Sequence, residues 1–151
     1  MPSRWQKWRA LSRRERRIAV EAGFEILRTA RRLRRGGLAR AGQDALIGTR
    51  PEASMLHSGS AADAVSIARI VEIASTVSPV RPNCLQRSVS LWRILHRHGI
   101  GSEVRIGARA DPRGDIPAFH AWTEHNGVVL NDHPDVASAF VPFSPRPHGT
   151  S

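Results

Sequence analysis

Apolar residues recur at helical spacing in the first part of the chain. Ser12, followed three residues later by Glu15, has the spacing of a capping box. The apolar positions after this box approximate one stripe with a period of about 3.6 residues. They are Ile18, Phe24, Leu27, Ala30 and Leu33. The pattern predicts a helix over residues 12–35, ended by Gly36 and Gly37, with the stripe facing a core.

Two more helices are predicted further along. Residues 36–59 are rich in Gly, Ala and Ser and are expected to form a mobile linker or a surface loop. Helical spacing returns over Ser60–Val77. A third helix is predicted over Cys84–His98, because Asn83 is a favourable N-cap and Gly99 stands where a C-terminal glycine belongs.

The rest of the chain favours strands, because short apolar runs alternate with turn residues. The predicted strands are Ser102–Ala108, Ala118–Glu124 and Val128–Asp132, with one last short strand after Phe140. Helices followed by antiparallel strands predict an α+β domain, in which the helix that begins at Cys84 packs on a small sheet.

The charge is concentrated at the front of the chain. The net charge is +10, and residues 1–40 account for all of it, whereas residues 41–151 sum to zero. We therefore expect a basic N-terminal helical segment (1–40), a linker (41–59) and a neutral core (60–151). Three interpretations of the arginine-rich face of 13–35 remain open: a solvated surface, a docking site for an acidic partner, and a surface that binds nucleic acid or membrane.

The single cysteine, Cys84, excludes a disulfide within the chain. A lone cysteine is typical of the reducing cytoplasm, where we expect this protein, and its thiol is free for chemistry. No apolar run approaches the roughly 20 residues of a membrane span, and no secretory signal is expected. The histidines lack zinc-ligand spacing and no glycine-rich phosphate loop is present, so neither metal nor cofactor is expected.

Cys84 is the candidate nucleophile. At the first position of a helix, the free N–H groups and the helix dipole stabilise an anion, so they favour the thiolate. Its own backbone N–H is then available to bind an oxyanion. The alternative is that Cys84 is a small buried apolar residue.

His120 and Asp132 are the candidate base and its orienting partner. Asn126-Gly127 between two apolar runs predicts a hairpin. A two-residue loop pairs Glu124 with Val129 and turns Asp132 to the other face. A three-residue loop with Gly127 as a bulge places His120 opposite Asp132, so the hypothesis requires that bulge.

Three further residues are candidates for substrate binding. Gln86 and Arg87 follow Cys84 in the first helical turn, and Trp122 shares the strand face of His120. The alternatives are an exposed helical arginine for Arg87 and a core position for Trp122.

These motifs together resemble the lasso peptide biosynthesis B2 protein family. The residues that carry the resemblance are Cys84-Leu85-Gln86-Arg87-Ser88, His98-Gly99-Ile100, Val104-Arg105-Ile106-Gly107, His120-Ala121-Trp122 and Asn131-Asp132. The resemblance implies a transglutaminase-like, papain-like core and a bacterial cysteine peptidase that removes the leader from a ribosomally made precursor peptide. Cys84, His120 and Asp132 would be its catalytic residues.

The same resemblance implies partners. A separate leader-recognition protein (B1) would present the precursor peptide, and a lasso cyclase (C protein) would take the freed core. Two other hypotheses for the function remain: another acyl transferase or amidase that uses the same core, and a basic binding module without catalysis.

Overall fold

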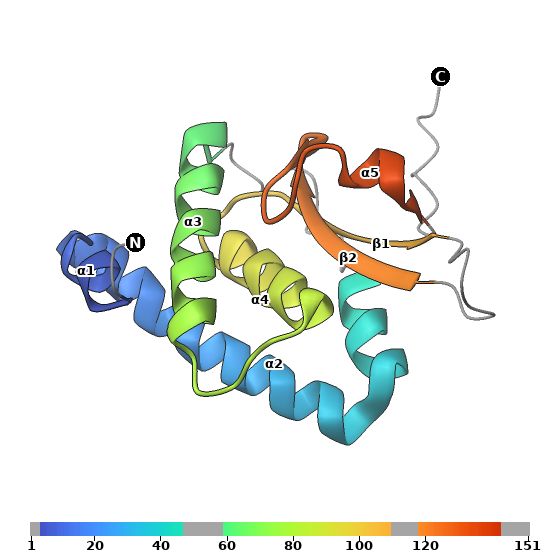
Figure 1. Ribbon diagram of the computed structural model, residues 1–151, viewed down its shortest axis with the longest axis horizontal. Coiled ribbons are helices and arrows are strands. Elements are labelled where there is room, and N and C mark those ends of the chain that lie inside the picture. The colour runs from blue at the N-terminus through green and yellow to red at the C-terminus, as the bar shows by residue number, and fades with distance from the viewer. Residues whose placement is uncertain (1–3, 47–58, 110–117, 143–151) are drawn as a thin grey trace.

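A computed structural model describes residues 4–46, 59–109 and 118–142 of the chain (Figure 1). The helices in this part are α1 (Arg4–Arg9), α2 (Arg13–Leu46), α3 (Ala61–Val77), α4 (Cys84–Arg97) and α5 (Val136–Ala139). The strands are β1 (Glu103–Arg109), β2 (Ala118–His125), β3 (Val128–Val129) and β4 (Val141–Pro142). The predicted α+β class is confirmed.

Helix α2 begins as predicted and ends later than predicted. The Ser12 hydroxyl accepts a hydrogen bond from the Glu15 backbone, and Glu15 accepts one from Ser12 N, which is the expected capping box. The helix continues to Leu46, so the predicted stop at Gly36-Gly37 is wrong, and so is a linker at 41–46. A glycine in a helix interior costs about 1 kcal/mol relative to alanine, and a penalty of this size does not by itself end a helix. Residues 47–58 of the predicted linker lie outside the described residues.

The next two helices confirm the predicted boundaries closely. Ser60 caps α3 by accepting a hydrogen bond from the Asp63 backbone. Cys84 is the first residue of α4, and Asn83 is its N-cap. Gly99, with a φ of 72°, follows α4 in the left-handed conformation, which glycine adopts without steric cost.

The four strands form one antiparallel sheet in the order β3-β2-β1-β4. The long pair β1 and β2 confirms two predicted strands, with Gly107 opposite His120. The predicted strand Val128–Asp132 is wrong beyond Val129, since β3 has only two residues. The predicted short strand after Phe140 is β4.

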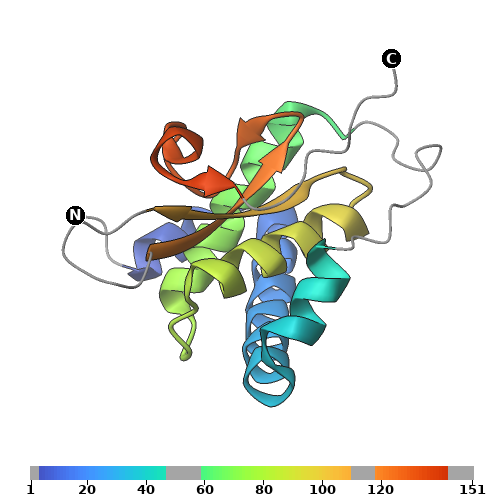
Figure 2. The same cartoon turned by 90° about the vertical axis from the view of Figure 1, so that its right-hand side faces the viewer.

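Helix α4 lies between the sheet and the pair α2 and α3 (Figures 1 and 2). The main core cluster combines apolar residues of these three helices, among them Ile26, Ile70, Leu91, Ile94 and Leu95, all fully buried. Each such side chain contributes about 1.5–3 kcal/mol by its burial. Because α2 shares this core, the basic segment 1–40 is not a separate unit from the predicted core.

Phe24 departs from the predicted apolar stripe. Its side chain is 72% exposed, whereas Ile18 is buried. Six residues separate them, which is about 240° of rotation on a helix, so the two cannot share a face. The buried apolar face of α2 is instead made of Ile18, Ala19, Ala22, Ile26 and Ala30.

A buried ion cluster fastens α2 to the C-terminal half of α4. The Glu25 carboxylate is 3% exposed and accepts a hydrogen bond from Arg93 at 3.1 Å and another from Arg97. Glu21 pairs with Arg97 at 3.0 Å at the edge of the same cluster. A buried carboxylate needs such partners, so the cluster fixes how the two helices face each other.

Candidate active site

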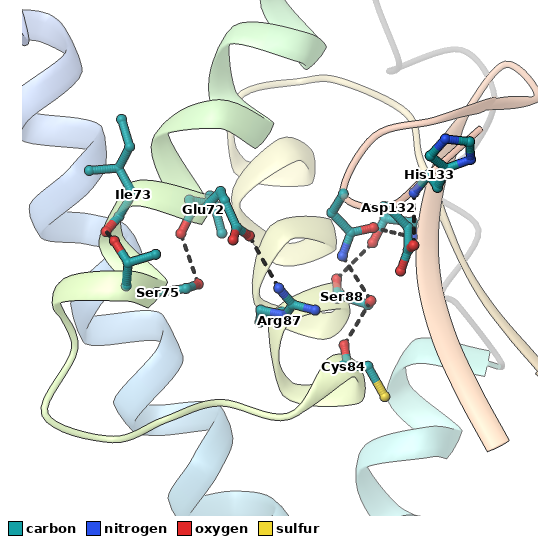
Figure 3. A network of polar contacts seen from close by, with 12 residues as sticks. Glu72, Ile73, Ser75, Cys84, Arg87, Ser88, Asp132 and His133 are labelled. Carbon is teal, nitrogen blue, oxygen red and sulfur yellow. Dashed lines mark hydrogen bonds and ion pairs between the residues drawn. The ribbon is translucent and has the colours of Figure 1, made fainter. Parts of the chain in front are cut away.

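Cys84 stands at a fully capped helix start. Asn83 Oδ1 accepts a hydrogen bond from Gln86 N at 2.8 Å, and Gln86 Oε1 accepts one from Asn83 N at 3.0 Å. The side chain of Cys84 is half-buried. In Figure 3 it projects from the first turn of α4, on the side away from Glu72 and α3. Cys84 therefore lies at the positive end of the helix dipole, as predicted.

His120 and Asp132 are in direct contact, although the loop that was required for it is absent. His120 Nε2 lies 2.5 Å from Asp132 Oδ2, and each side chain is 23% exposed. Asn126 and Gly127 form a two-residue turn with φ values of 50° and 79°, and Glu124 pairs with Val129. The prediction that Gly127 must form a bulge is therefore wrong.

The contact forms because the strand stops before it reaches Asp132. The last ladder hydrogen bond runs from Leu130 N to Thr123 O at 2.9 Å. Thr123 N then donates to the side chain of Asn131 at 2.7 Å instead of to a backbone carbonyl. Strand alternation no longer constrains the residues after Val129, so Asp132 can turn back toward His120.

Ser88 links Cys84 to the residues next to His120 and Asp132, and sequence reasoning did not identify this role. Its fully buried hydroxyl lies 2.9 Å from the carbonyl of Cys84 and 3.1 Å from the carbonyl of Ala121, which follows His120. The same hydroxyl accepts a hydrogen bond from Asn131 Nδ2 at 3.0 Å, beside Asp132. Figure 3 shows Ser88 between Cys84 and the segment that carries Asp132. The only sequence signal was a serine one helical turn after the cysteine.

Cys84 and His120 are held on adjacent elements without a direct bond. Both residues are described, and no hydrogen bond joins the Cys84 sulfur to the His120 ring. The structure thus brings His120 and Asp132 together and ties Cys84 to them through Ser88.

The environment of Asp132 favours its charged form. Partial burial opposes ionisation, but the hydrogen bonds from His120 and from the backbone of His133, with the positive charges of His120 and Arg87, outweigh it. The pKa of Asp132 therefore lies below its ordinary value. An ionised Asp132 accepts a hydrogen bond from the His120 ring and so orients it.

A comparison with known families shows which superfamily the chain belongs to. The profile described as the transglutaminase-like superfamily matches residues 25–144. The chain belongs to the transglutaminase-like superfamily. Searches of curated proteins and of solved structures gave no significant match. The transglutaminase-like fold is thus shown, and members of this superfamily are typically cysteine-dependent enzymes.

Aromatic rings enclose His120 in this transglutaminase-like site. The Phe140 ring lies 5.1 Å from the His120 ring, centre to centre, and Arg109 lies 5.0 Å from the centre of Phe140. Trp122 is fully buried, 6.5 Å from His120, and donates a hydrogen bond to Glu124. A fully buried ring has no surface for substrate, so the suggested substrate-binding role of Trp122 is corrected to a core position.

Gln86 and Arg87 are occupied by other partners. The carbonyl of the Gln86 side chain is used in the capping box. Arg87 Nη1 lies 3.3 Å from Glu72 of α3, and its buried Nε has no hydrogen-bond partner among the described residues. The structure places Arg87 where its charge acts on Asp132. Substrate contacts of Gln86 and Arg87 remain predictions.

A cavity of about 790 Å³ reaches Asp132, the acidic residue of the candidate site. Its walls come from α1, α3 and the segment after β3, where Leu130, Asn131 and Asp132 line it. In the described part of the chain, no three potential metal-ligating side chains come together. Within the same ranges, no helix combines the length and apolar character that crossing a membrane requires.

Proposed function

We propose that this transglutaminase-like domain is a cysteine peptidase with Cys84 as nucleophile, His120 as general acid and base, and Asp132 as the residue that orients His120. The observation that carries the proposal is the His120–Asp132 contact, joined through Ser88 to a helix that begins at Cys84. The start of a helix places free backbone N–H groups beside the sulfur of Cys84, and a carboxylate-bound imidazole favours proton transfer.

The proposed reaction has two halves. The sulfur of Cys84 attacks the carbonyl carbon of a peptide bond while His120 Nδ1 takes the thiol proton. The tetrahedral intermediate collapses to a thioester as His120 returns the proton to the leaving amine. Water then attacks the thioester, His120 accepts its proton, and the thiol of Cys84 is restored. The backbone N–H of Cys84 is the proposed oxyanion donor.

In this proposal, Cys84 and His120 come into direct contact only when substrate is bound. Catalytic hydrogen bonds are often long without substrate and shorten when it binds. The cap on α4 and the bond from Ser88 to the Ala121 carbonyl hold in place the two elements that carry Cys84 and His120.

The proposed substrate is a ribosomally made precursor peptide, from which the enzyme removes the leader. This proposal rests on the resemblance to the lasso peptide biosynthesis B2 protein family. It includes two partners, a leader-recognition protein that presents the precursor and a cyclase that receives the core. The proposed location is the bacterial cytoplasm. Hydrolysis without metal or cofactor is consistent with a thiol, an imidazole and a carboxylate as the working groups.

The first experiment uses the fact that Cys84 is the only cysteine. Iodoacetamide should modify one site, and the modified protein should lose precursor cleavage in proportion to the modified fraction. Retained cleavage by fully alkylated protein contradicts the proposal. The second experiment compares product masses with and without an added primary amine. Free leader acid in both samples supports a peptidase, whereas leader amide in the amine sample identifies an acyl transferase.

A further inference from the structure

The outward face of α2 combines arginines with exposed apolar residues. Counting 100° per residue, seven exposed side chains fall within about 40° of one line along the helix. They are Arg13, Arg17, Val20, Phe24, Arg28, Arg31 and Arg35, called here the Arg–Phe24 face. Two arginines precede the apolar pair and three follow it, over a length of about 33 Å. The opposite side of the helix is buried against α3 and α4.

The apolar centre of this face is unusual for a solvated helix. Phe24 is 72% exposed and Val20 is 49% exposed, one turn apart. A phenylalanine exposed to this extent loses the free energy that its burial would contribute. Clusters of aromatic residues and arginine are enriched at the centres of protein interfaces.

The arginines of the face have no acidic partner among the residues that the structure describes. The nearest acids of α2 are engaged elsewhere. Glu21 pairs with Arg97 and His98, and Glu25 is buried against Arg93 and Arg97. The positive charge of the face is therefore available to a partner of opposite charge.

Three alternative occupants fit less well. A second copy of the chain would bring arginines against arginines, which charge repulsion disfavours. A membrane-bound helix buries a wide apolar face, but the wide apolar face of α2 is already in the core. A nucleic-acid duplex offers phosphates along its length and no apolar surface opposite Phe24 and Val20.

We infer that the Arg–Phe24 face is the docking surface for an acidic protein partner that presents an apolar patch bordered by carboxylates. Phe24 packs on the patch, and the flanking arginines pair with the border. The face lies on the side of α2 away from α4, which carries Cys84, so docking leaves the candidate active site uncovered. The inference is independent of the chemistry proposed for Cys84.

The test uses two labelled helical peptides of equal negative charge. One carries glutamates around a central leucine cluster, and the other has serines in place of the leucines. Fluorescence polarisation should show that the full-length protein binds the leucine peptide about tenfold more tightly, a factor typical of burying one large apolar side chain. Phe24→Ala should abolish this difference. Arg17→Glu combined with Arg28→Glu should weaken both peptides.

Phe119→Ala is the matched control, because this phenylalanine is also exposed (59%) but lies on β2. It should bind both peptides as the unmodified protein does. Circular dichroism of each variant should match the unmodified protein. Equal binding of the two peptides, or unchanged binding by Phe24→Ala, overturns the inference. Tighter binding to a 20-base-pair DNA duplex or to phosphatidylglycerol vesicles, or self-association through this face, overturns it as well.

Discussion

Ser88→Ala tests whether the candidate site is held together by one hydroxyl. The substitution removes the acceptor of the Asn131 side chain and the donor to the Ala121 carbonyl, while the backbone of α4 keeps its own hydrogen bonds. Alanine also fits a helix interior well, so the helix itself should not be weakened. What is lost is the link that the hydroxyl makes from α4 to the Ala121 carbonyl of β2 and to Asn131, whereas the hydrogen bond from the Thr123 hydroxyl to the Ser88 carbonyl remains.

The magnitude follows from the groups left without partners. A buried polar group that loses its partner costs about 1–3 kcal/mol. The Ser88 hydroxyl can donate to only one carbonyl at a time, and Cys84 O also accepts from within the helix. One buried amide donor and one carbonyl are thus affected, and we expect a loss of about 2–3 kcal/mol in the free energy of unfolding.

Ser90→Ala is the matched control. Ser90 is also fully buried in α4, and its hydroxyl bonds the carbonyl four residues earlier at 2.7 Å, but it has no bond to the sheet. Urea unfolding of both variants gives the difference in their free energies of unfolding, which is the contribution of the Ser88 bonds to Ala121 and Asn131. We expect Ser90→Ala to lose less than about 1 kcal/mol. Equal losses for the two variants would refute the role assigned to Ser88.

Three further predictions concern the surroundings of the site. Glu25→Ala leaves Arg93 without its buried partner and should cost about 3–5 kcal/mol in urea unfolding; a loss below 1 kcal/mol would contradict the ion cluster. A methyl group at Gly107 would stand 2.9 Å from Phe140 Cβ, so Gly107→Ala should cost about 1–3 kcal/mol and slow any reaction that uses His120. Unchanged stability and rate would disprove that packing. The lowered pKa of Asp132 means that its charged form adds stability above the unfolded pKa, and that this stability is lost as pH falls through the folded pKa. In urea unfolding at a series of pH values, the unmodified protein should therefore lose its stability advantage over Asp132→Asn below about pH 4. An advantage that does not depend on pH would contradict the lowered pKa of Asp132.

Local patterns predicted the helices and the long strands well. Helical spacing indicated α3, and the N-cap Asn83 fixed the start of α4 and hence the position of Cys84 at a helix N-terminus. Alternating apolar residues predicted β1 and β2. The stop predicted at Gly36 and Gly37 was wrong because a local cost of about 1 kcal/mol per glycine does not by itself end a helix.

The site itself was only partly predictable. The pairing of His120 with Asp132 was expected from a bulged hairpin, but it arises because Asn131 replaces the backbone in the ladder and ends the strand. Side-chain bonds of this kind depend on three-dimensional placement. Ser88 shows the same limit, since its partners are 33 and 43 residues away in the sequence.

The exposure of Phe24 follows from helical periodicity and could have been predicted from the sequence. The predicted stripe joined positions that lie on different sides of a regular helix. A stricter count of rotation per residue would have placed Phe24 among the arginines.

The most direct test of the central claim is the rate of precursor-peptide cleavage by Cys84→Ala, measured by mass spectrometry beside the unmodified protein and in the presence of the partner proteins. The account predicts that the variant folds normally, because Cys84 is half-buried and contributes only its backbone to the Ser88 network. It also predicts that cleavage falls to background. Cleavage by a folded Cys84→Ala variant at the rate of the unmodified protein would contradict a thiol-based active site.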